Sequence, residues 1–158
     1  MLGTDLYNTG GVSMGVLLQK RFAVSNGKVA FDFEVRTGLT LLCGDSGSGK
    51  TRFFSLYRKR CAYDRNDNIE FIDWQDNGNS IKNKLNAKGK VFIIDSADVV
   101  LTDNVANHIK NDKYNQYIIL GRSLERYGAT KRDVAIIVRS KDGVYKLWYY
   151  REDQQIRE

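Results

Sequence analysis

The chain has no proline, two cysteines and one histidine among its 158 residues, and no long apolar run. Without proline, turns have to be located from glycine, asparagine and aspartate. Cys43 and Cys61 do not have the spacing of zinc ligands and cannot build a disulfide scaffold, so we expect a reducing, cytoplasmic setting. We expect no membrane-spanning helix. The N-terminal residues also lack the basic and apolar regions of a signal peptide.

The composition is that of one folded domain. Apolar residues make up 42% of the chain and aromatic residues 11%, which argues against disorder. We expect a single domain over residues 1–158, with 1–15 and 151–158 frayed. The net charge of +6 suits an anionic ligand such as a nucleotide or nucleic acid, and it also suits an ordinary solvated surface.

Hydrophobic periodicity predicts a hairpin, then alternating strands and helices, then a second hairpin. Asn26-Gly27 and Asp142-Gly143 are the hairpin turns. The expected strands are 16–24, 28–35, 39–43, 69–74, 91–95, 116–121, 133–139 and 144–150, and the expected helices are 49–60, 80–88 with Ser80 as N-cap, and 102–111. Alternating strands and helices predict an α/β fold with a mainly parallel sheet that helices cover on both faces.

One segment carries a phosphate-binding pattern. GDSGSGKT follows a buried strand, precedes a helix and fits G-x-x-x-x-G-K-[ST] in full. Glycines allow backbone N–H groups to approach an anion, and the helix N-terminus faces the phosphates. The residues expected to hold the nucleotide are Gly44, Asp45, Ser46, Gly47, Ser48, Gly49, Lys50, Thr51 and the adjacent Arg52.

The chemistry of this pattern also assigns a metal site. Lys50 would reach the β- and γ-phosphates, and the Thr51 hydroxyl would bind Mg²⁺. The apolar strand VFIID ends in Asp95, a carboxylate that can hold Mg²⁺ directly or through water. We therefore expect Thr51 and Asp95 to form the metal side of the site.

These motifs resemble those of the P-loop NTPases, with GDSGSGKT as Walker A and VFIID as Walker B. The resemblance is closest to the ABC and AAA families. It implies a three-layer, mainly parallel, RecA-like sheet, with antiparallel hairpins at the N- and C-terminal ends of this chain, and one strand between the Walker A and Walker B strands. It also implies ATP binding, and Gln75 in WQD resembles the glutamine of the ABC glutamine loop.

The chain departs from those families where hydrolysis is concerned. No LSGGQ sequence is present, and Ser96 follows Asp95 where these families usually have glutamate. Asp98 is the candidate substitute for that base. Arg122, after the strand 116–121, is a candidate γ-phosphate sensor or a finger for a neighbouring subunit. His108 is expected to be an ordinary surface residue of a helix.

The sequence therefore favours a Mg-ATP-binding protein, a slow ATPase or ATP-dependent switch that acts with a protein partner or by self-association. ATP is preferred to GTP because NKLN at 83–86 has asparagine where the guanine motif N-K-x-D needs aspartate. A small phosphotransferase with a basic lid at 121–132 is an alternative, and it requires adjacent Walker A and Walker B strands. A nucleic-acid-binding accessory protein is a further alternative, although no nucleic-acid motif is present.

Overall fold

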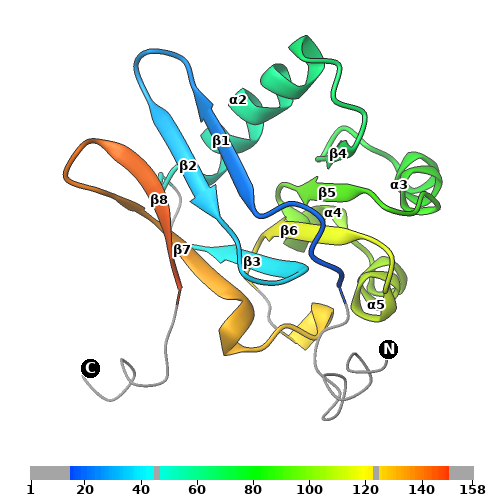
Figure 1. Cartoon of the computed structure of the whole chain (residues 1–158). Helices are drawn as coiled ribbons and strands as arrows, with labels where there is room; N and C mark the ends of the chain where they lie inside the picture. Colours follow the sequence, from blue (N-terminus) through cyan, green and yellow to red (C-terminus); the bar gives the residue numbers. More distant parts are fainter. Residues whose placement is uncertain (1–14, 45–46, 123–124, 150–158) are drawn as a thin grey trace, which may run out of the picture.

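The structure, a computed structural model, describes residues 15–44, 47–122 and 125–149. Within them, eight strands form one sheet in the order β1-β2-β8-β7-β3-β6-β5-β4 (Figure 1). The strands are β1 (Arg21–Ser25), β2 (Ala30–Glu34), β3 (Leu39–Cys43), β4 (Ile69–Ile72), β5 (Val91–Ile94), β6 (Gln116–Leu120), β7 (Val134–Arg139) and β8 (Val144–Tyr149). The helices are α2 (Lys50–Tyr63), α3 (Gly78–Leu85), α4 (Ala97–Val100) and α5 (Asp103–Asn111), with 3₁₀ turns η1 (Glu125–Tyr127) and η2 (Lys131–Asp133).

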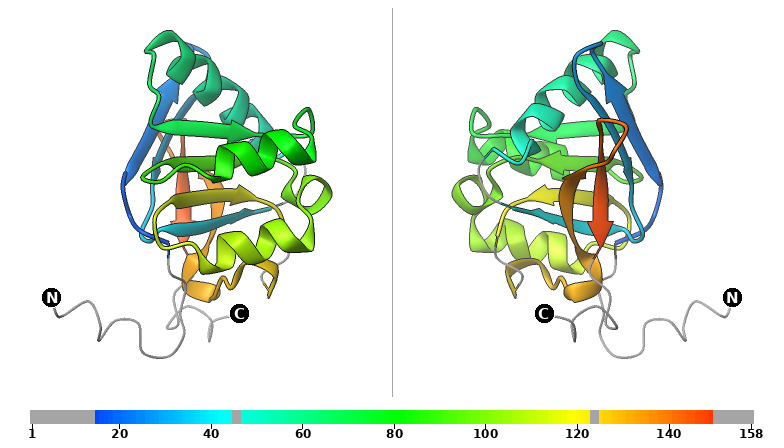
Figure 2. Two further views of the ribbon diagram at one scale, coloured as in Figure 1. Left: turned by 90° about the vertical axis from the view of Figure 1, so that its right-hand side faces the viewer. Right: turned by 90° about the vertical axis from the view of Figure 1, so that its left-hand side faces the viewer.

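The expected three-layer, mainly parallel, RecA-like sheet is wrong. The sheet is mixed, because the pairs β1–β2 and β7–β8 are antiparallel, and it curls into a half-barrel with few helices. The two hairpins do not stand apart at the ends of the chain. They join each other through a parallel β2–β8 pairing that sets Phe31 opposite Tyr145. Figure 2 shows β1, β2 and β8 running steeply across the direction of β4, β5 and β6.

Helix α2 explains the curl. The ring of Tyr57 in α2 lies 5.7 Å from that of Phe22 on β1 and 6.3 Å from that of Phe71 on β4. These are the two edge strands of the sheet. One helix thus fills the concave face, and Phe53 and Phe54 of the same helix are also buried. Aromatic side chains from both hairpins are buried from water by packing against α2, which lies on that side of the sheet. The sheet therefore closes around this helix.

The opposite face of β3, β6 and β5 is covered by the shorter helices. Ile81 and Leu85 of α3, Ala106 and Ile109 of α5, and Tyr127 of η1 belong to a second buried cluster with residues of these strands. β4 ends the sheet on this side, and its outer edge is occupied, because Lys84 of α3 donates a 2.8 Å hydrogen bond to the Phe71 carbonyl. A capped edge strand resists pairing with another chain.

Most expected elements are present, with shifts at their ends. α2 extends three residues beyond its expected end at 60, and α3 begins at Gly78 instead of 80. Ser80 is not the N-cap: the Asn77 side chain accepts from the Ser80 N–H and caps α3. Almost all of 1–15 and 151–158, where fraying is expected, lies outside the described residues. No helix of the described residues is long and apolar enough to cross a membrane.

Candidate nucleotide-binding site

The glycine-rich segment lies where the sequence places it, between the central strand β3 and the first turn of α2. Gly44, Gly47 and Gly49 have positive φ angles of 135°, 91° and 107°. Gly49 is the N-cap of α2, and a side chain at its φ would be strained. The local sequence therefore dictates a turn that exposes the N-terminal N–H groups of α2. Asp45 and Ser46 lie outside the described residues.

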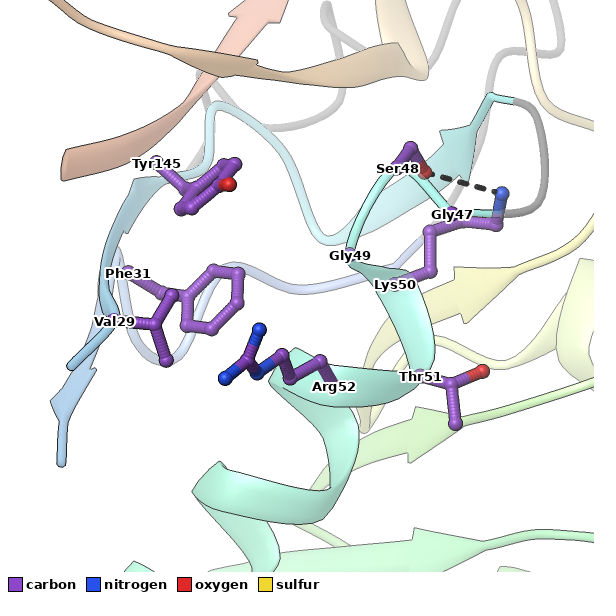
Figure 3. Close-up of a pocket in the computed structure, with 9 residues that line it drawn as sticks. All are labelled: Val29, Phe31, Gly47, Ser48, Gly49, Lys50, Thr51, Arg52 and Tyr145. Carbon is purple, nitrogen blue, oxygen red and sulfur yellow. Dashed lines mark hydrogen bonds between the residues drawn. The ribbon is translucent and has the colours of Figure 1, made fainter. Parts of the chain in front are cut away.

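Lys50 lies across this turn. Its Nζ donates to the Gly44 carbonyl. It also lies 3.5 Å from the Ser48 hydroxyl, the contact drawn in Figure 3. The side chain therefore folds back over the turn instead of extending into solvent. An ammonium group held there, above the N-terminus of a 14-residue helix, provides a positive region suited to an anion.

Thr51 and Asp95 are brought together as expected. The Thr51 hydroxyl lies 3.3 Å and 3.5 Å from the two carboxylate oxygens of Asp95. The Ser96 N–H donates to the same carboxylate at 2.9 Å, and Ser96 has a left-handed backbone with φ of 55°. Burial raises the pKa of Asp95, and the charge of Asp73 raises it further, against the hydrogen bonds from Thr51 and Ser96.

This pair of residues fits Mg²⁺. Both supply hard oxygen donors, and neighbouring oxygens around Mg²⁺ lie roughly 3 Å apart when each metal–oxygen distance is about 2.1 Å. The described residues contain no group of three or more His, Cys, Asp or Glu side chains placed to hold a metal. A cation here would thus take its other ligands from phosphates and water, which is how Mg²⁺ usually binds in nucleotide sites.

A cavity of about 300 Å³ adjoins the turn and is lined by aromatic residues that the sequence did not single out. Phe31 of β2 and Tyr145 of β8 stack with ring centroids 5.2 Å apart, and Arg52 reaches the same cavity from α2 (Figure 3). Arg52 was expected at the site, but Phe31 and Tyr145 were missed because their pairing depends on the union of the two hairpins.

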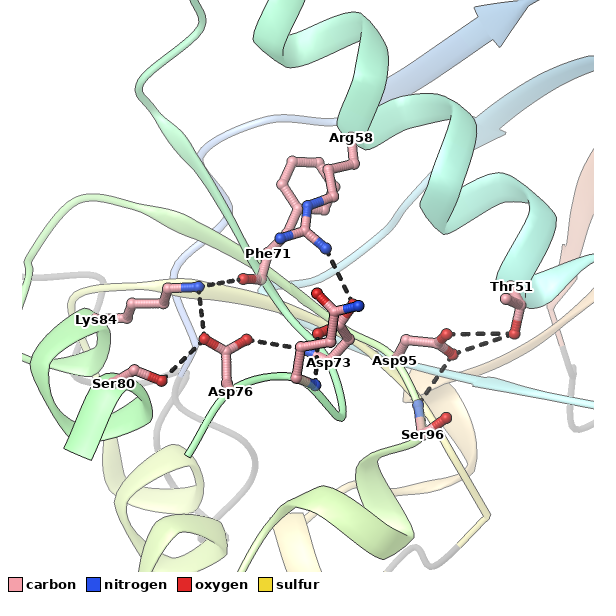
Figure 4. A network of polar contacts seen from close by, with 10 residues as sticks. Thr51, Arg58, Phe71, Asp73, Asp76, Ser80, Lys84, Asp95 and Ser96 are labelled. Carbon is pink, nitrogen blue, oxygen red and sulfur yellow. Dashed lines mark hydrogen bonds and ion pairs between the residues drawn. The ribbon is translucent and has the colours of Figure 1, made fainter. Parts of the chain in front are cut away.

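Asp73 is a second residue that the sequence reading missed. It follows β4 directly, is 8% exposed, and its carboxylate accepts a 3.0 Å bond from Arg58 of α2 (Figure 4). The signal was present in the sequence, since IEFID at 69–73 and VFIID at 91–95 both end an apolar strand in aspartate. Because β4 and β5 are parallel neighbours, the residues that follow them lie at the same end of the two strands.

A polar network supports Asp73 from the α3 side. The Asp73 N–H donates to Asp76, whose other carboxylate oxygen accepts from Ser80 and Lys84 at 2.9 Å and 3.0 Å (Figure 4). Burial acts to raise the pKa of Asp76, but the hydrogen bonds from Asp73, Lys84 and Ser80 outweigh it and lower the pKa. The loop between β4 and α3 is thereby held by an ionised carboxylate.

The remaining expected site residues are engaged elsewhere or exposed. Asp98 of α4 accepts a 2.9 Å hydrogen bond from the Arg122 N–H and so ties α4 to the end of β6. The side chain of Arg122 is exposed, and Gln75 is exposed with its N–H bonded to Asp73. The structure thus brings Lys50, Thr51 and Asp95 to one place, whereas the backbone contacts of Asp98, Arg122 and Gln75 are made with other groups.

The strand order bears on the alternatives. β6 lies between β3, which leads into the glycine-rich turn, and β5, which is followed directly by Asp95. The intervening strand that the ABC and AAA resemblance implies is therefore present, although the sheet as a whole differs from that of those families. No protein-family model and no curated protein matches the chain.

Proposed function

We propose that the chain binds Mg-ATP at residues 44–51 and works as a slow ATPase or ATP-dependent switch. The observation that carries the proposal is the first turn of α2. There Lys50 bonds the Gly44 carbonyl, and the adjacent Thr51 lies 3.3 Å from the Asp95 carboxylate. In this arrangement Lys50 would bind the phosphates and Thr51 would bind the metal, which supports the site that the glycine-rich pattern predicts.

Each group has a defined task. The N–H groups at the start of α2 would receive phosphate oxygens, and Lys50 would exchange the Gly44 carbonyl for the β- and γ-phosphates. Thr51 and Asp95 would hold Mg²⁺, which supplies charge neutralisation to the phosphate oxygens. The exchange at Lys50 replaces a neutral acceptor with an anionic one and makes a stronger hydrogen bond.

The aromatic cavity supports a purine base. It opens beside the turn that would hold the phosphates, and the partly exposed Tyr145, backed by the buried Phe31, offers an aromatic surface for stacking. Arg52 adds a cationic group at the same cavity. Stacking alone does not select adenine, so the preference for ATP over GTP rests on the lack of a guanine motif in NKLN.

Slow turnover follows from the groups around Asp95. Ser96 carries no carboxylate, and the Asp98 carboxylate already accepts the Arg122 N–H. A general base typically contributes 10²–10⁴-fold to a rate, so a base limited to an Asp98 that already accepts the Arg122 N–H would slow water attack while leaving nucleotide affinity intact. A protein partner or a second copy would then be needed for fast hydrolysis. The two free cysteines fit a reducing, cytoplasmic setting.

The two alternatives receive less support. A phosphotransferase was expected to have adjacent Walker A and Walker B strands, and β6 separates them here. The segment proposed as its lid is partly packed down, because Arg126 donates a 2.6 Å bond to the Leu101 carbonyl and Tyr127 is buried. No described feature favours nucleic acid over a nucleotide.

The decisive experiment is calorimetric titration of Mg-ATP into wild type, Lys50→Ala and the control Lys59→Ala. Lys59 lies exposed on the same helix, so its loss should leave the affinity within about twofold. We expect Lys50→Ala to weaken binding at least about 100-fold, as loss of a charged bond to phosphate should. Wild-type protein without measurable affinity at millimolar ATP would refute the proposal.

A further inference from the structure

Helix α2 faces the ends of two neighbouring strands at once. Thr51 and Arg58 are seven residues apart, which is two helical turns and about 10 Å along the axis, so they lie on one helix face. Thr51 contacts Asp95 at the end of β5, and Arg58 contacts Asp73 at the end of β4. Figure 4 shows the two contacts side by side.

The two carboxylates belong to the same face of the sheet. β4 and β5 are parallel with Ile72 opposite Ile94, and the Asp95 N–H continues the ladder by donating to the Ile72 carbonyl at 2.9 Å. Phe71, two positions before Asp73, belongs to the buried cluster around α2. Because side chains alternate along a strand, Asp73 and Asp95 both point toward α2.

Two buried negative charges at neighbouring positions need a cation. Asp73 and Asp95 are each 8% exposed. Arg58 donates to one oxygen of Asp73, while the other oxygen accepts the Gln75 N–H. The side chain of Arg58 is 43% exposed, so it can move away from Asp73 into solvent without leaving an unpaired charge in the interior.

We propose that Asp73 and Arg58 form a positioning pair that sets the metal affinity of the nucleotide site. This inference rests on the proposed function. Asp73 strengthens a divalent cation held by Thr51 and Asp95, through its charge and by accepting hydrogen bonds from the water ligands of the cation. Arg58 weakens the same cation, because it neutralises Asp73 and takes up one of its oxygens.

The pair predicts opposite effects for its two members. Asp73 would support the metal ligands without binding the metal itself. Removing the charge of such a group typically lowers metal affinity 10–100-fold. Removal of the Arg58 charge leaves the Asp73 carboxylate without its arginine partner. The full negative charge of Asp73 then attracts the cation, and the metal affinity rises. A role limited to packing would instead weaken binding in both variants, because both would loosen the same part of the structure.

The test is a Mn²⁺ titration, followed by electron paramagnetic resonance, of protein saturated with a non-hydrolysable ATP analogue. We expect Asp73→Asn to weaken Mn²⁺ at least about tenfold and Arg58→Gln to tighten it roughly threefold or more. Arg58→Lys, which keeps the charge, should stay near wild type. The matched control is Arg60→Gln, which breaks the exposed Arg60–Asp64 pair on the same helix and should change nothing.

The outcomes separate the two proposals. If wild type does not bind the Mn²⁺–nucleotide complex, the proposed function fails and the pair fails with it. If wild type binds and both Asp73→Asn and Arg58→Gln weaken Mn²⁺, or both leave it within twofold, only the positioning pair is refuted. Thermal melts of each variant without metal identify any that has not folded. If Arg58→Gln has not folded, Arg58→Met, which also removes the charge but keeps a long side chain, takes its place in the comparison with Asp73→Asn.

Discussion

The hydroxyl of Thr51 lies 3.3 Å from a carboxylate oxygen of Asp95, although 44 residues separate them in the chain. Thr51 stands in the first turn of α2 and Asp95 directly after β5, with β6 between β5 and the strand that leads to α2. This contact is the strongest structural support for a metal–nucleotide site, because it joins two residues that were each expected to bind Mg²⁺ on separate grounds.

Thr51 should therefore control the effect of the metal more than the affinity for the nucleotide alone. We expect Thr51→Ala to lose most of the Mg²⁺-dependent gain in ATP affinity, roughly tenfold, while affinity in the presence of EDTA is unchanged. Thr51→Ser keeps the hydroxyl and should restore the gain. Titrations with and without EDTA measure both. Equal losses with and without metal would contradict this assignment.

Asp95→Asn should stabilise the metal-free protein. Burial, with the charge of Asp73, raises the pKa of Asp95, so the folded state holds a proton more tightly than the unfolded chain does. The ionised form therefore costs stability at neutral pH. We expect the variant to melt roughly 2–4 °C above wild type at pH 7 and to lose the stabilisation by Mg-ATP, the trade common at functional sites.

The pH dependence checks the cause. Wild type regains this stability as the pH falls through the raised pKa toward the ordinary value of 3.8, so the difference in melting temperature should shrink over that range. Calorimetric scans between pH 7 and pH 4 measure it. A difference that stays constant across the range would show that the substitution acts by packing instead of charge.

Tyr145 should contribute to nucleotide affinity by stacking. Base–aromatic stacking is worth about 1–3 kcal/mol by alanine substitution, so Tyr145→Ala should weaken ATP binding roughly 5- to 150-fold. Tyr145→Phe keeps the ring and should bind like wild type. Trp148→Ala removes an aromatic side chain from the same strand, away from the cavity, and serves as the control. If Tyr145→Ala bound ATP with unchanged affinity, the base would not bind in this cavity.

Gly49 should be intolerant of a side chain. Its φ of 107° lies where an L-residue is strained, so Gly49→Ala should lower the free energy of unfolding by about 1–2 kcal/mol. Gly78, at the start of α3, has open space around it and no positive φ, and its alanine variant should be neutral or more stable by up to about 1 kcal/mol. Urea denaturation compares the two, and equal effects would contradict the prediction.

Ser96 should behave in the opposite way. Its backbone is left-handed at φ 55°, so Ser96→Gly should raise the free energy of unfolding by about 1 kcal/mol while keeping the N–H bond to Asp95. Ser55 lies exposed in the middle of α2, and Ser55→Gly should lower stability by roughly 0.5–1 kcal/mol. If Ser96→Gly destabilised the protein, the serine side chain would be needed at this position.

The local elements were readable from the sequence because their causes are local. Asn26-Gly27 and Asp142-Gly143 turn their hairpins, and apolar runs mark the buried strands β3, β5 and β6. The predicted fold class was wrong because the fold depends on which strands of the two hairpins pair with each other. The sequences of residues 28–35 and 144–150 contain no pattern that predicts a parallel pairing of these strands with Phe31 opposite Tyr145.

The site divides along the same line. The glycine-rich turn, Lys50, Thr51 and the strand-end Asp95 could be predicted from the sequence, because backbone freedom and side-chain chemistry reside in those residues. Three other features could be found only in the fold: Asp98 accepts the Arg122 N–H, Arg58 pairs with Asp73, and Phe31 and Tyr145 line a cavity beside the turn. These are contacts between distant segments, and they form because a curled sheet closes around α2.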